Sequence, residues 1–290
     1  SKQCIKKKWN VTSLSKRKPK KFRFLKGVKY IYCDISNKNN LKKKLKEKYN
    51  YVVNLGGDID HNNRNKTFKS HYIGCKNLAD FFKNRKIDAF IQMGSSSEYG
   101  RLKSPHDESF LGSPLSAYGS AKLKSTKYLL KLFKEDKFPA IILRLYQAYG
   151  PKQDINRLIP IIIFNSLKDK KFPCSHGKQF RDFIYIDDVI SVILKCLYKK
   201  KLFGNIFNIG FGKPIKIKKI INTICNKNGC GTPLFGLIKL RRDETLKVYP
   251  KIKKTKKLLN WKPKVSLYKG LKKTYISYQR DINKKIFNQR

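Results

Sequence analysis

An apolar run, a long helical pattern and a second apolar run follow one another between residues 89 and 145. Ala89–Met93 and Ala140–Leu145 are each typical of a buried strand, and 116–135 has the length and pattern of a helix. A strand, a helix and a strand in this order predict a βαβ unit within a parallel sheet. The sequence therefore predicts an α/β protein whose ligands bind at the carboxyl ends of the strands.

The size of the chain fits one such domain with a smaller lobe, since 40% of its 290 residues are hydrophobic. Its formal net charge of +49 invites a nucleic-acid interpretation. The lysines, however, are spread along the whole chain, and Asn and Ile, which share A/T-rich codons with Lys, are also abundant. Base bias explains the charge better, so we expect no nucleic-acid partner, although the charge should attract a polyanionic nucleotide.

The seven cysteines have neither C-x-x-C spacing nor a paired framework. Cys33, Cys75 and Cys196 sit in apolar patterns and are interpreted as small core residues, which indicates a reducing cytoplasm. No stretch approaches the ~20 apolar residues of a spanning helix, and no signal peptide is recognisable. The four histidines are scattered, so neither a membrane nor a metal is expected as a partner.

Tyr118 and Lys122 are four residues apart, on one face of the predicted helix 116–135. An ammonium there can stabilise a phenolate and lower the pKa of the tyrosine, which suits proton transfer to or from a hydroxyl. The serines of Ser95-Ser96-Ser97 follow the first predicted strand, and Ser95 can orient the same hydroxyl. This pattern predicts oxidation of an alcohol or reduction of a ketone beside a nicotinamide, with Ser95, Tyr118 and Lys122 as catalytic residues.

Several further motifs occur in a fixed order and together resemble the extended short-chain dehydrogenase/reductase family, in its nucleotide-sugar epimerase/dehydratase branch. They are Tyr51–Gly57, Tyr72–Leu78, Leu143–Pro151, Arg181–Val189, Phe207–Gly210 and Leu259–Pro263. The resemblance implies a Rossmann-like doubly wound parallel sheet in residues 1–150. It implies that 151–290 form mainly a C-terminal substrate lobe, with segments near 181–210 returning to the main sheet.

The resemblance also implies roles for individual residues. Cofactor contacts are expected from Ser15, Arg17, Asp34, Ile35, Leu55, Gly56, Lys122 and Tyr146. Substrate contacts are expected from Ser96, Gln147, Arg181 and Arg241, the two arginines meeting the nucleotide diphosphate. The implied activity is NAD(P)-dependent hydride transfer at a carbinol or keto carbon of a nucleotide-activated sugar, at C4, with Tyr118 as acid/base.

The glycine-rich phosphate loop that opens such a domain is not present in this chain. Residues 1–9 resemble the second half of the helix that follows that loop, and Val11–Ser15 resembles the second strand. We expect the chain to be a fragment without the first strand, whose neighbours would then have unpaired edges. The alternative is a natural chain that has lost cofactor binding.

The sequence leaves two possible reactions open, that of an epimerase and that of a ketoreductase. Dehydratases of this family place an acidic pair just after the catalytic hydroxyl, whereas Ser96 and Ser97 stand there and Glu98 is one position too late. Dehydration is therefore disfavoured, and Glu98 is interpreted as a structural residue. A non-catalytic sugar-nucleotide-binding relative is a further alternative, which the intact Ser95, Tyr118 and Lys122 argue against.

The choice between NAD and NADP depends on the residues after the second strand. An acidic residue there would bind the ribose 2′-hydroxyl of NAD, and a basic one the 2′-phosphate of NADP. Ser15 is followed by Lys16-Arg17-Lys18, with no acid, which favours NADP and a reductase.

Helices are predicted over 39–48, 65–84, 155–167 and 187–199. In the last of these Asp188 is interpreted as a favourable charge at the helix start, while Tyr185 and Asn208 are interpreted as structural. The resemblance implies a homodimer through the helices 65–84 and 116–135. Apolar residues in the second helix were expected to supply its surface: Leu123, Leu129, Leu130 and Phe133.

Overall fold

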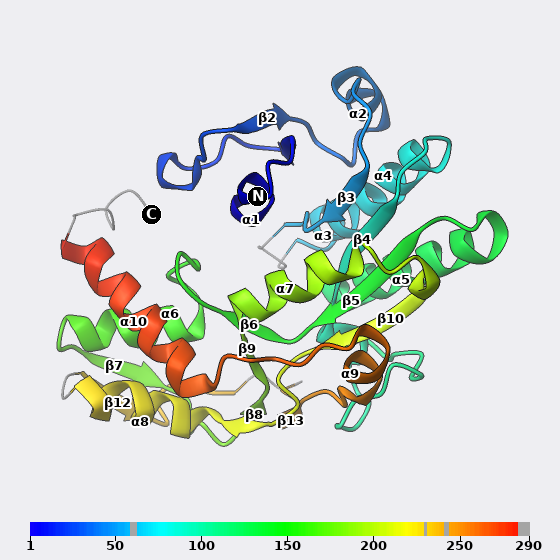
Figure 1. The fold of residues 1–290 in the computed structure, drawn as a ribbon. Helices are drawn as coiled ribbons and strands as arrows, with labels where there is room; N and C mark the ends of the chain where they lie inside the picture. Colours follow the sequence, from blue (N-terminus) through cyan, green and yellow to red (C-terminus); the bar gives the residue numbers. More distant parts are fainter. Residues whose placement is uncertain (59–62, 229–230, 241–243, 284–290) are drawn as a thin grey trace.

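The predicted βαβ unit forms the centre of the molecule. The computed structural model describes residues 1–58, 63–228, 231–240 and 244–283 (Figure 1). Its main sheet is parallel, with strand order β10-β5-β4-β3. These strands are β3 (Tyr51–Asn54), β4 (Ala89–Ser95), β5 (Ala140–Leu145) and β10 (Asn205–Ile209). Helix α5 (Ala117–Asp136) joins β4 to β5, as the sequence predicts.

Helices cover both faces of this sheet. Phe90 and Ile142 lie on the face that packs against α4 (Gly74–Lys83) and α5. Their neighbours Ile91 and Ile141 point to the opposite face, against α7 (Ile186–Cys196) and the residues around α9 (Lys253–Leu259). All seven residues of β4 are buried. A strand that is apolar on both faces is what a sheet covered on both sides requires.

Strands β1 (Val11–Ser15) and β2 (Val28–Tyr32) form a second, two-stranded parallel sheet. They follow a short helix α1 (Lys2–Lys6), and none of the residues of β1 is fully buried. Trp9, just before β1, stacks on Tyr51 of β3 with ring centroids 5.3 Å apart. Within the described residues β1 pairs only with β2, and β3 only with β4. The predicted absence of an opening strand stays a prediction.

The predicted helix 65–84 is present, but its middle turn is widened. It runs through α3 (Arg64–Phe68), a π-helical segment (Lys69–Ile73) and α4. The segment places His71, which is buried, against the start of α5. A π-helical turn contains one more residue than an α-helical turn, and it needs no special residue types. The hydrophobic periodicity of the sequence therefore does not reveal it.

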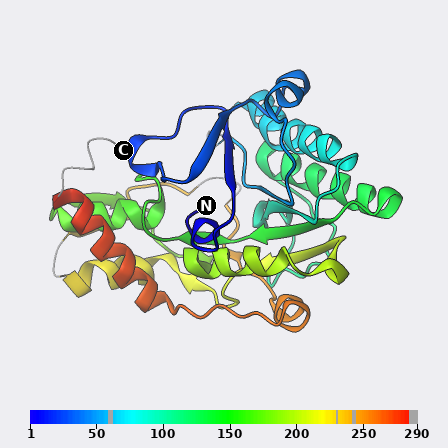
Figure 2. The same ribbon diagram turned by 45° about the horizontal axis from the view of Figure 1, so that its top comes forward.

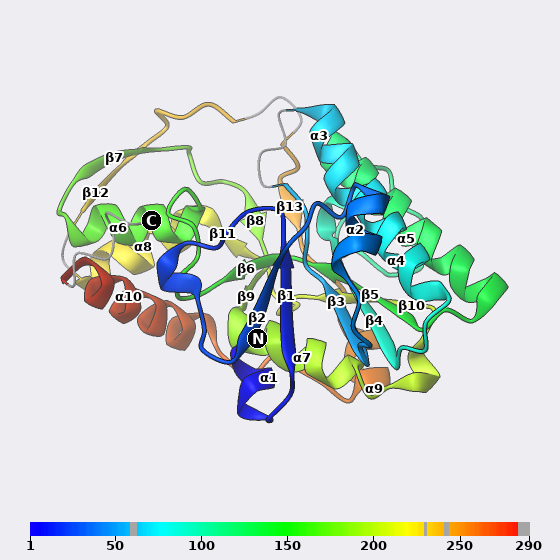
Figure 3. The same cartoon turned by 90° about the horizontal axis from the view of Figure 1, so that it is seen from above.

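The C-terminal part forms a third apolar cluster, and Figures 1 and 2 place it at the opposite end of the molecule from α4 and α5. Figure 3 shows β1 and β2 between these two ends. The helices here are α6 (Leu158–Leu167), α8 (Ile217–Asn228) and α10 (Leu267–Asn283). The strands are β6 (Gln147–Tyr149), β7 (Lys171–Cys174), β8 (Phe180–Arg181), β9 (Phe183–Tyr185), β11 (Ile215–Lys216), β12 (Thr232–Phe235) and β13 (Lys247–Val248).

Several predicted helix ends shift. Helix α2 (Lys38–Lys44) ends before the predicted Lys48, and α6 begins at Leu158 instead of Ile155. The N-cap of α2 is Asn37, whose side chain accepts from the amide of Asn40.

Asp188 lies in the first turn of α7, as the interpretation of a favourable charge at the helix start requires, but it forms no capping hydrogen bond there. Its carboxylate accepts from the amides of Lys264 and Val265, at 2.9 and 3.0 Å, and so ties α7 to the segment before α10. The structural interpretation of Tyr185 and Asn208 is confirmed, because both are buried among protein contacts.

Three of the four residues proposed for a dimer interface already pack inside the chain. Leu123 and Leu129 are buried, and Leu129 belongs to the cluster beneath α4 and α5. Phe133 packs closely against Gly204. These three side chains are therefore not available to form an apolar interface with a partner. The homodimer itself stays a prediction.

Candidate active site

The structure brings Ser95, Tyr118 and Lys122 together. Ser95 is the last residue of β4, and the other two lie in the first turns of α5, whose N-cap Ser116 accepts from the amide of Gly119. The side chain of Ser95 lies close enough to Tyr118 to lower the pKa of its hydroxyl. The Lys122 ammonium lies 5.8 Å from the centre of the Tyr118 ring and donates to the carbonyl of Met93 at 2.8 Å. A strand end and a helix start thus meet at the carboxyl edge of the sheet.

Burial dominates the electrostatics of this cluster. It raises the pKa of Tyr118, as does the charge of Glu98, while the hydrogen bond from Ser95 and the charge of Arg157 lower it. Burial likewise lowers the pKa of Lys122, against the opposing charge of Glu98. The prediction that Lys122 lowers the pKa of Tyr118 is therefore wrong for this structure, because desolvation of the phenolate outweighs the charges around it.

The register of the serine turn agrees with the choice of Ser95. Ser95 is the N-cap of a short 3₁₀ turn (Ser96–Glu98), and its Oγ accepts from the amide of Ser97 at 3.1 Å. Ser96 is half-buried beside it, and Glu98 is fully buried and points inward. The structural interpretation of Glu98 is confirmed, and no acidic pair follows the catalytic hydroxyl.

Six of the eight residues expected to bind the cofactor lie at the carboxyl ends of the first three strands. Leu55, after β3, has an exposed fraction of 64%. Asp34, after β2, pairs with Lys16 at 2.7 Å and accepts from the amide and hydroxyl of Ser36. Arg17, after β1, is exposed. An exposed apolar side chain beside cations and a carboxylate suits the rings, sugars and phosphates of a dinucleotide.

The other three expected cofactor residues take part in turns or packing. The hydroxyl of Ser15 donates to the carbonyl of Arg17 at 2.7 Å, and the amide of Gly56 donates to Asn54 Oδ1 at 3.0 Å. The side chain of Ile35 packs against Gly56 and Gly74. These contacts shape the loops at the strand ends.

Tyr146 directly follows β5. Its side chain is buried, and its hydroxyl lies 2.9 Å from Nδ1 of His106, which also stacks on Tyr99. The expected cofactor contact of Tyr146 stays a prediction.

Of the expected substrate residues, Gln147 is exposed at the start of β6. Arg181 forms an ion pair with Glu244, and burial lowers the pKa of its guanidinium. A phosphate would compete with that carboxylate for the same guanidinium. Arg241 lies outside the described residues.

Two residues near the tyrosine escaped prediction. His71 packs edge-on against Tyr118, with ring centroids 4.8 Å apart, and its Nε2 lies 3.0 Å from the carbonyl of Asp58. Arg157, the N-cap of α6, lies near enough for its charge to lower the pKa of Tyr118. Sequence offered no signal for His71, while Arg157 stands out only as one of the rarer arginines before an apolar helix.

In the part of the chain that the structure describes, no group of three or more His, Cys, Asp or Glu side chains could hold a metal ion. The helices described there include none that is both long and apolar enough to cross a bilayer.

The fold and this cluster together define the class of Rossmann-like proteins with a serine, a tyrosine and a lysine at one strand end. The family model described as "NAD dependent epimerase/dehydratase family" matches residues 1–210. The chain belongs to this family, and the resemblance stated from its motifs is confirmed.

Individual relatives agree with this membership. The chain is 31% identical over 207 residues to "Uncharacterized UDP-glucose epimerase YtcB" of Bacillus subtilis (strain 168), covering 70% of this chain and 65% of that protein. It is 29% identical over 207 residues to the dTDP-D-glucose 4,6-dehydratase of Homo sapiens, covering 68% of this chain and 58% of that protein. The chain thus spans less than two thirds of both curated relatives.

A solved structure extends the likeness over nearly the whole chain. The UDP-glucuronic acid 4-epimerase of Bacillus cereus, in complex with UDP-glucuronic acid and NAD, is 26% identical with a TM-score of 0.84. The match covers 96% of this chain and 94% of that one. The predicted α/β fold with a parallel central sheet is therefore confirmed.

Proposed function

We propose that this protein is an NAD(P)-dependent enzyme that transfers hydride at C4 of a nucleotide-activated sugar, as an epimerase or a 4-ketoreductase. The observation that carries the proposal is the approach of the Ser95 and Tyr118 side chains, with Lys122 beside them at the carboxyl end of β4. Membership of the epimerase/dehydratase family supports the same reaction class.

Each of the three residues has a separate task in this proposal. The nicotinamide, when bound, supplies the hydride acceptor and donor. Ser95 Oγ orients the sugar hydroxyl, and Tyr118 Oη takes its proton or returns one. Lys122 holds its charge beside them and binds the nicotinamide ribose. The exposed Leu55 and Arg17 are proposed to receive the adenosine side of the cofactor.

Dehydration remains the weaker alternative. Glu98 is the acidic residue of the serine turn, and its carboxylate already accepts three hydrogen bonds. A carboxylate held in this way is not available to remove or deliver a proton on the sugar. A binding protein without catalysis is a further alternative, against which the assembled Ser95–Tyr118 contact stands.

The proposed substrate is a sugar linked to a nucleoside diphosphate, with Ser96 and Gln147 meeting the sugar and Arg181 and Arg241 its phosphates. The two epimerase names among the relatives, one for UDP-glucose and one for UDP-glucuronic acid, support a UDP-sugar. We also propose that residues 1–150 bind the cofactor and 151–290 mainly the substrate. The pairing of β10 with β5 supports the return of the latter part to the main sheet.

We further propose a homodimer that works in the cytoplasm. Support for a reducing compartment comes from Cys33, Cys75, Cys174, Cys196 and Cys225, which are buried free thiols.

The test is an assay of the full-length protein with two kinds of substrate. UDP-glucose, UDP-galactose, UDP-glucuronic acid and dTDP-glucose, each with NAD or NADP, test the epimerase and the dehydratase. A nucleotide-linked 4-keto-6-deoxy sugar with NADH or NADPH tests the ketoreductase, because only a keto carbon can be reduced. Nuclear magnetic resonance identifies the products, and we expect either C4 inversion of a sugar or C4 reduction of the keto sugar in the parent and not in Tyr118→Phe. Release of a 4-keto-6-deoxy sugar would establish the dehydratase instead, and no change in any sugar would refute the enzyme.

A further inference from the structure

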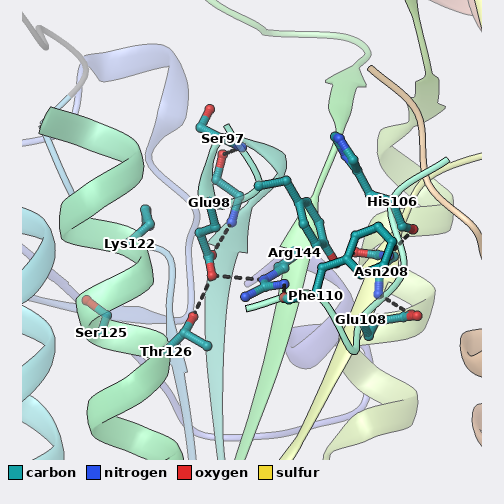
Figure 4. A network of polar contacts seen from close by, with 12 residues as sticks. Ser97, Glu98, His106, Glu108, Phe110, Lys122, Ser125, Thr126, Arg144 and Asn208 are labelled. Atoms are coloured by element: carbon teal, nitrogen blue, oxygen red, sulfur yellow. Dashed lines mark hydrogen bonds and ion pairs between the residues drawn. The ribbon is translucent and has the colours of Figure 1, made fainter. Parts of the chain in front are cut away.

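Glu98 is fully buried, yet its carboxylate connects three separate elements. It accepts from the amide of Ser95 at 2.8 Å, from Thr126 Oγ1 in α5 at 2.8 Å, and from Nε of Arg144 in β5 at 2.9 Å (Figure 4). One carboxylate thus links the end of β4, the catalytic helix and the neighbouring strand. The first contact is with Ser95 itself, and Thr126 lies one helical turn after Lys122. Arg144 is paired across the sheet with Gly94, the residue before Ser95.

Arg144 is equally buried and is held on several sides. Only 1% of its side chain is exposed, its Nη1 donates to the carbonyl of Phe110 at 3.3 Å, and its guanidinium lies 4.4 Å from the centre of the Tyr99 ring. A buried ion pair seldom stabilises a fold more than apolar side chains of the same volume would. The position of this pair beneath the active site therefore calls for a role other than stability.

The pair determines the shape of the serine turn. Glu98 and Ser95 form a capping box. The Ser95 side chain accepts from a backbone amide inside the turn, and the Glu98 side chain accepts from the backbone amide of Ser95. The turn has little room to move, because a Cβ atom on Gly94 would lie 2.6 Å from Glu98 Oε1. One on Gly119 would lie 2.4 Å from the carbonyl oxygen of Ser97. The serine turn is thus clamped between the end of β4 and the first turn of α5.

We propose that the Glu98–Arg144 pair is a positioning device for the catalytic hydroxyls, which fixes the serine turn against α5 so that the side chains of Ser95 and Tyr118 meet. This inference rests on the proposed function for its consequence in catalysis. Glu98 and Arg144 act through Ser95 and do not contact the sugar themselves.

The charge of Glu98 also affects the pKa values of Tyr118 and Lys122. The charged or titratable groups near Tyr118 are Glu98, Lys122 in α5, Arg157 at the start of α6 and His71 in the π-helical segment. Glu98 raises the pKa of Tyr118 and also that of Lys122. Loss of this carboxylate should therefore lower both pKa values, whereas loss of the Ser95 hydrogen bond should raise that of Tyr118.

The experiment separates positioning from stability through a neutral pair. Glu98→Gln/Arg144→Met removes both charges, so that neither is left unpaired in the interior. Ile220→Ala is the matched control, because Ile220 is fully buried in the distant cluster between α6 and α8. Both proteins are compared with the parent in urea unfolding and in turnover of the nucleotide sugar.

We expect the neutral pair to be at least as stable as Ile220→Ala and yet to lose on the order of a hundredfold in kcat, the usual cost of misplacing catalytic groups by about 1 Å. The KM for the sugar should change little, because no substrate contact is removed. Turnover of the neutral pair at the level of Ile220→Ala would overturn the proposal, since the pair would then be merely structural.

A second readout needs no turnover. The ionisation of Tyr118 is obtained from the near-ultraviolet phenolate absorbance of a protein minus that of its Tyr118→Phe counterpart. We expect Ser95→Ala to move the midpoint of this titration to higher pH in the parent and to leave it unchanged in the neutral pair, where the side chains of Ser95 and Tyr118 no longer meet. An equal shift in both backgrounds would refute the inference. Because no sugar is present, this result is independent of whether the proposed reaction is found.

Discussion

The main sheet and the sheet of β1 and β2 are both parallel but differ sharply in how well they are enclosed. Every residue of β4 is buried between helices on both faces, whereas no residue of β1 is fully buried and its sheet has two strands. The catalytic cluster is attached to β4, and the residues expected to meet the adenosine side of the cofactor follow β1 and β2. The hydroxyl chemistry therefore has a rigid base, while the cofactor side has the weaker support of a small, half-exposed sheet.

The largest effect should come from the enclosed side. Tyr118→Phe removes the transferable proton but keeps the ring, which packs against His71. We expect turnover to fall about 10²–10⁴-fold, the range for a positioned acid/base, with cofactor affinity and unfolding nearly unchanged. Steady-state kinetics and cofactor titration measure both, and near-normal turnover would remove Tyr118 from the reaction.

Matched truncations in the two sheets test the contrast in stability. Ile142→Ala in β5 empties a fully buried position and should cost about 2–5 kcal/mol of unfolding free energy. Leu14→Ala in β1, where the side chain is only half-buried, should cost about 1 kcal/mol. Urea unfolding and hydrogen exchange of the β1 and β5 amides measure the difference. Equal costs would mean that β1 is as firmly held as the main sheet.

Stability should also depend on pH through Asp182, which lies between the main sheet and the C-terminal lobe. Its carboxylate is buried and accepts from the amides of Phe211, Gly212 and Lys213 at 2.6–2.9 Å. Burial raises its pKa from 3.8 to about 6, against these hydrogen bonds. A raised carboxyl pKa means that the folded protein binds the proton more tightly, so this contribution is full below pH ~4 and is lost as pH rises through ~6.

Asp182→Asn should remove that dependence. The unfolding free energy of the parent relative to the variant should fall by about 3 kcal/mol between pH 4 and pH 7, the equivalent of the stated pKa difference. The exposed Asp187→Asn is the control, and unfolding in urea at both pH values is the measurement. A constant difference between parent and Asp182→Asn would show that the pKa of Asp182 is ordinary.

The sequence was sufficient wherever structure follows from local pattern. The apolar runs of β4 and β5 and the helix α5 between them were enough to place Ser95, Tyr118 and Lys122 at one strand end, as the structure has them. It failed where a residue's role depends on a partner far along the chain. Asp188 binds amides of residues 264 and 265, and Tyr146 turns toward His106, 40 residues away.

The direction of the pKa change at Tyr118 was also predicted wrongly from the sequence. The sign of the pKa change at Tyr118 depends on how much water the fold excludes, and a Tyr-x-x-x-Lys spacing contains no information on that. The widened turn at 69–73 escaped for a related reason, because one extra residue in a turn leaves the composition of a helix unchanged.

The smallest effect is expected on the open side, where the choice of cofactor is decided. Lys16 is occupied by Asp34, whereas Arg17 is exposed at the end of β1 and offers a planar fork to a 2′-phosphate. Arg17→Ala should cost on the order of 1.5–3 kcal/mol in NADPH binding, the range for a hydrogen bond to a charged group, and little in NADH binding. Lys18→Ala, which removes a neighbouring exposed cation, controls for general attraction of anions. Titration of both cofactors into parent and variants is the measurement.

A clear NADPH preference that depends on Arg17 favours the ketoreductase, because a reductase consumes fresh reductant at each turnover. Tightly retained NAD, with no such preference, restores the epimerase, in which the cofactor returns its hydride to the same sugar and need never leave the half-exposed sheet.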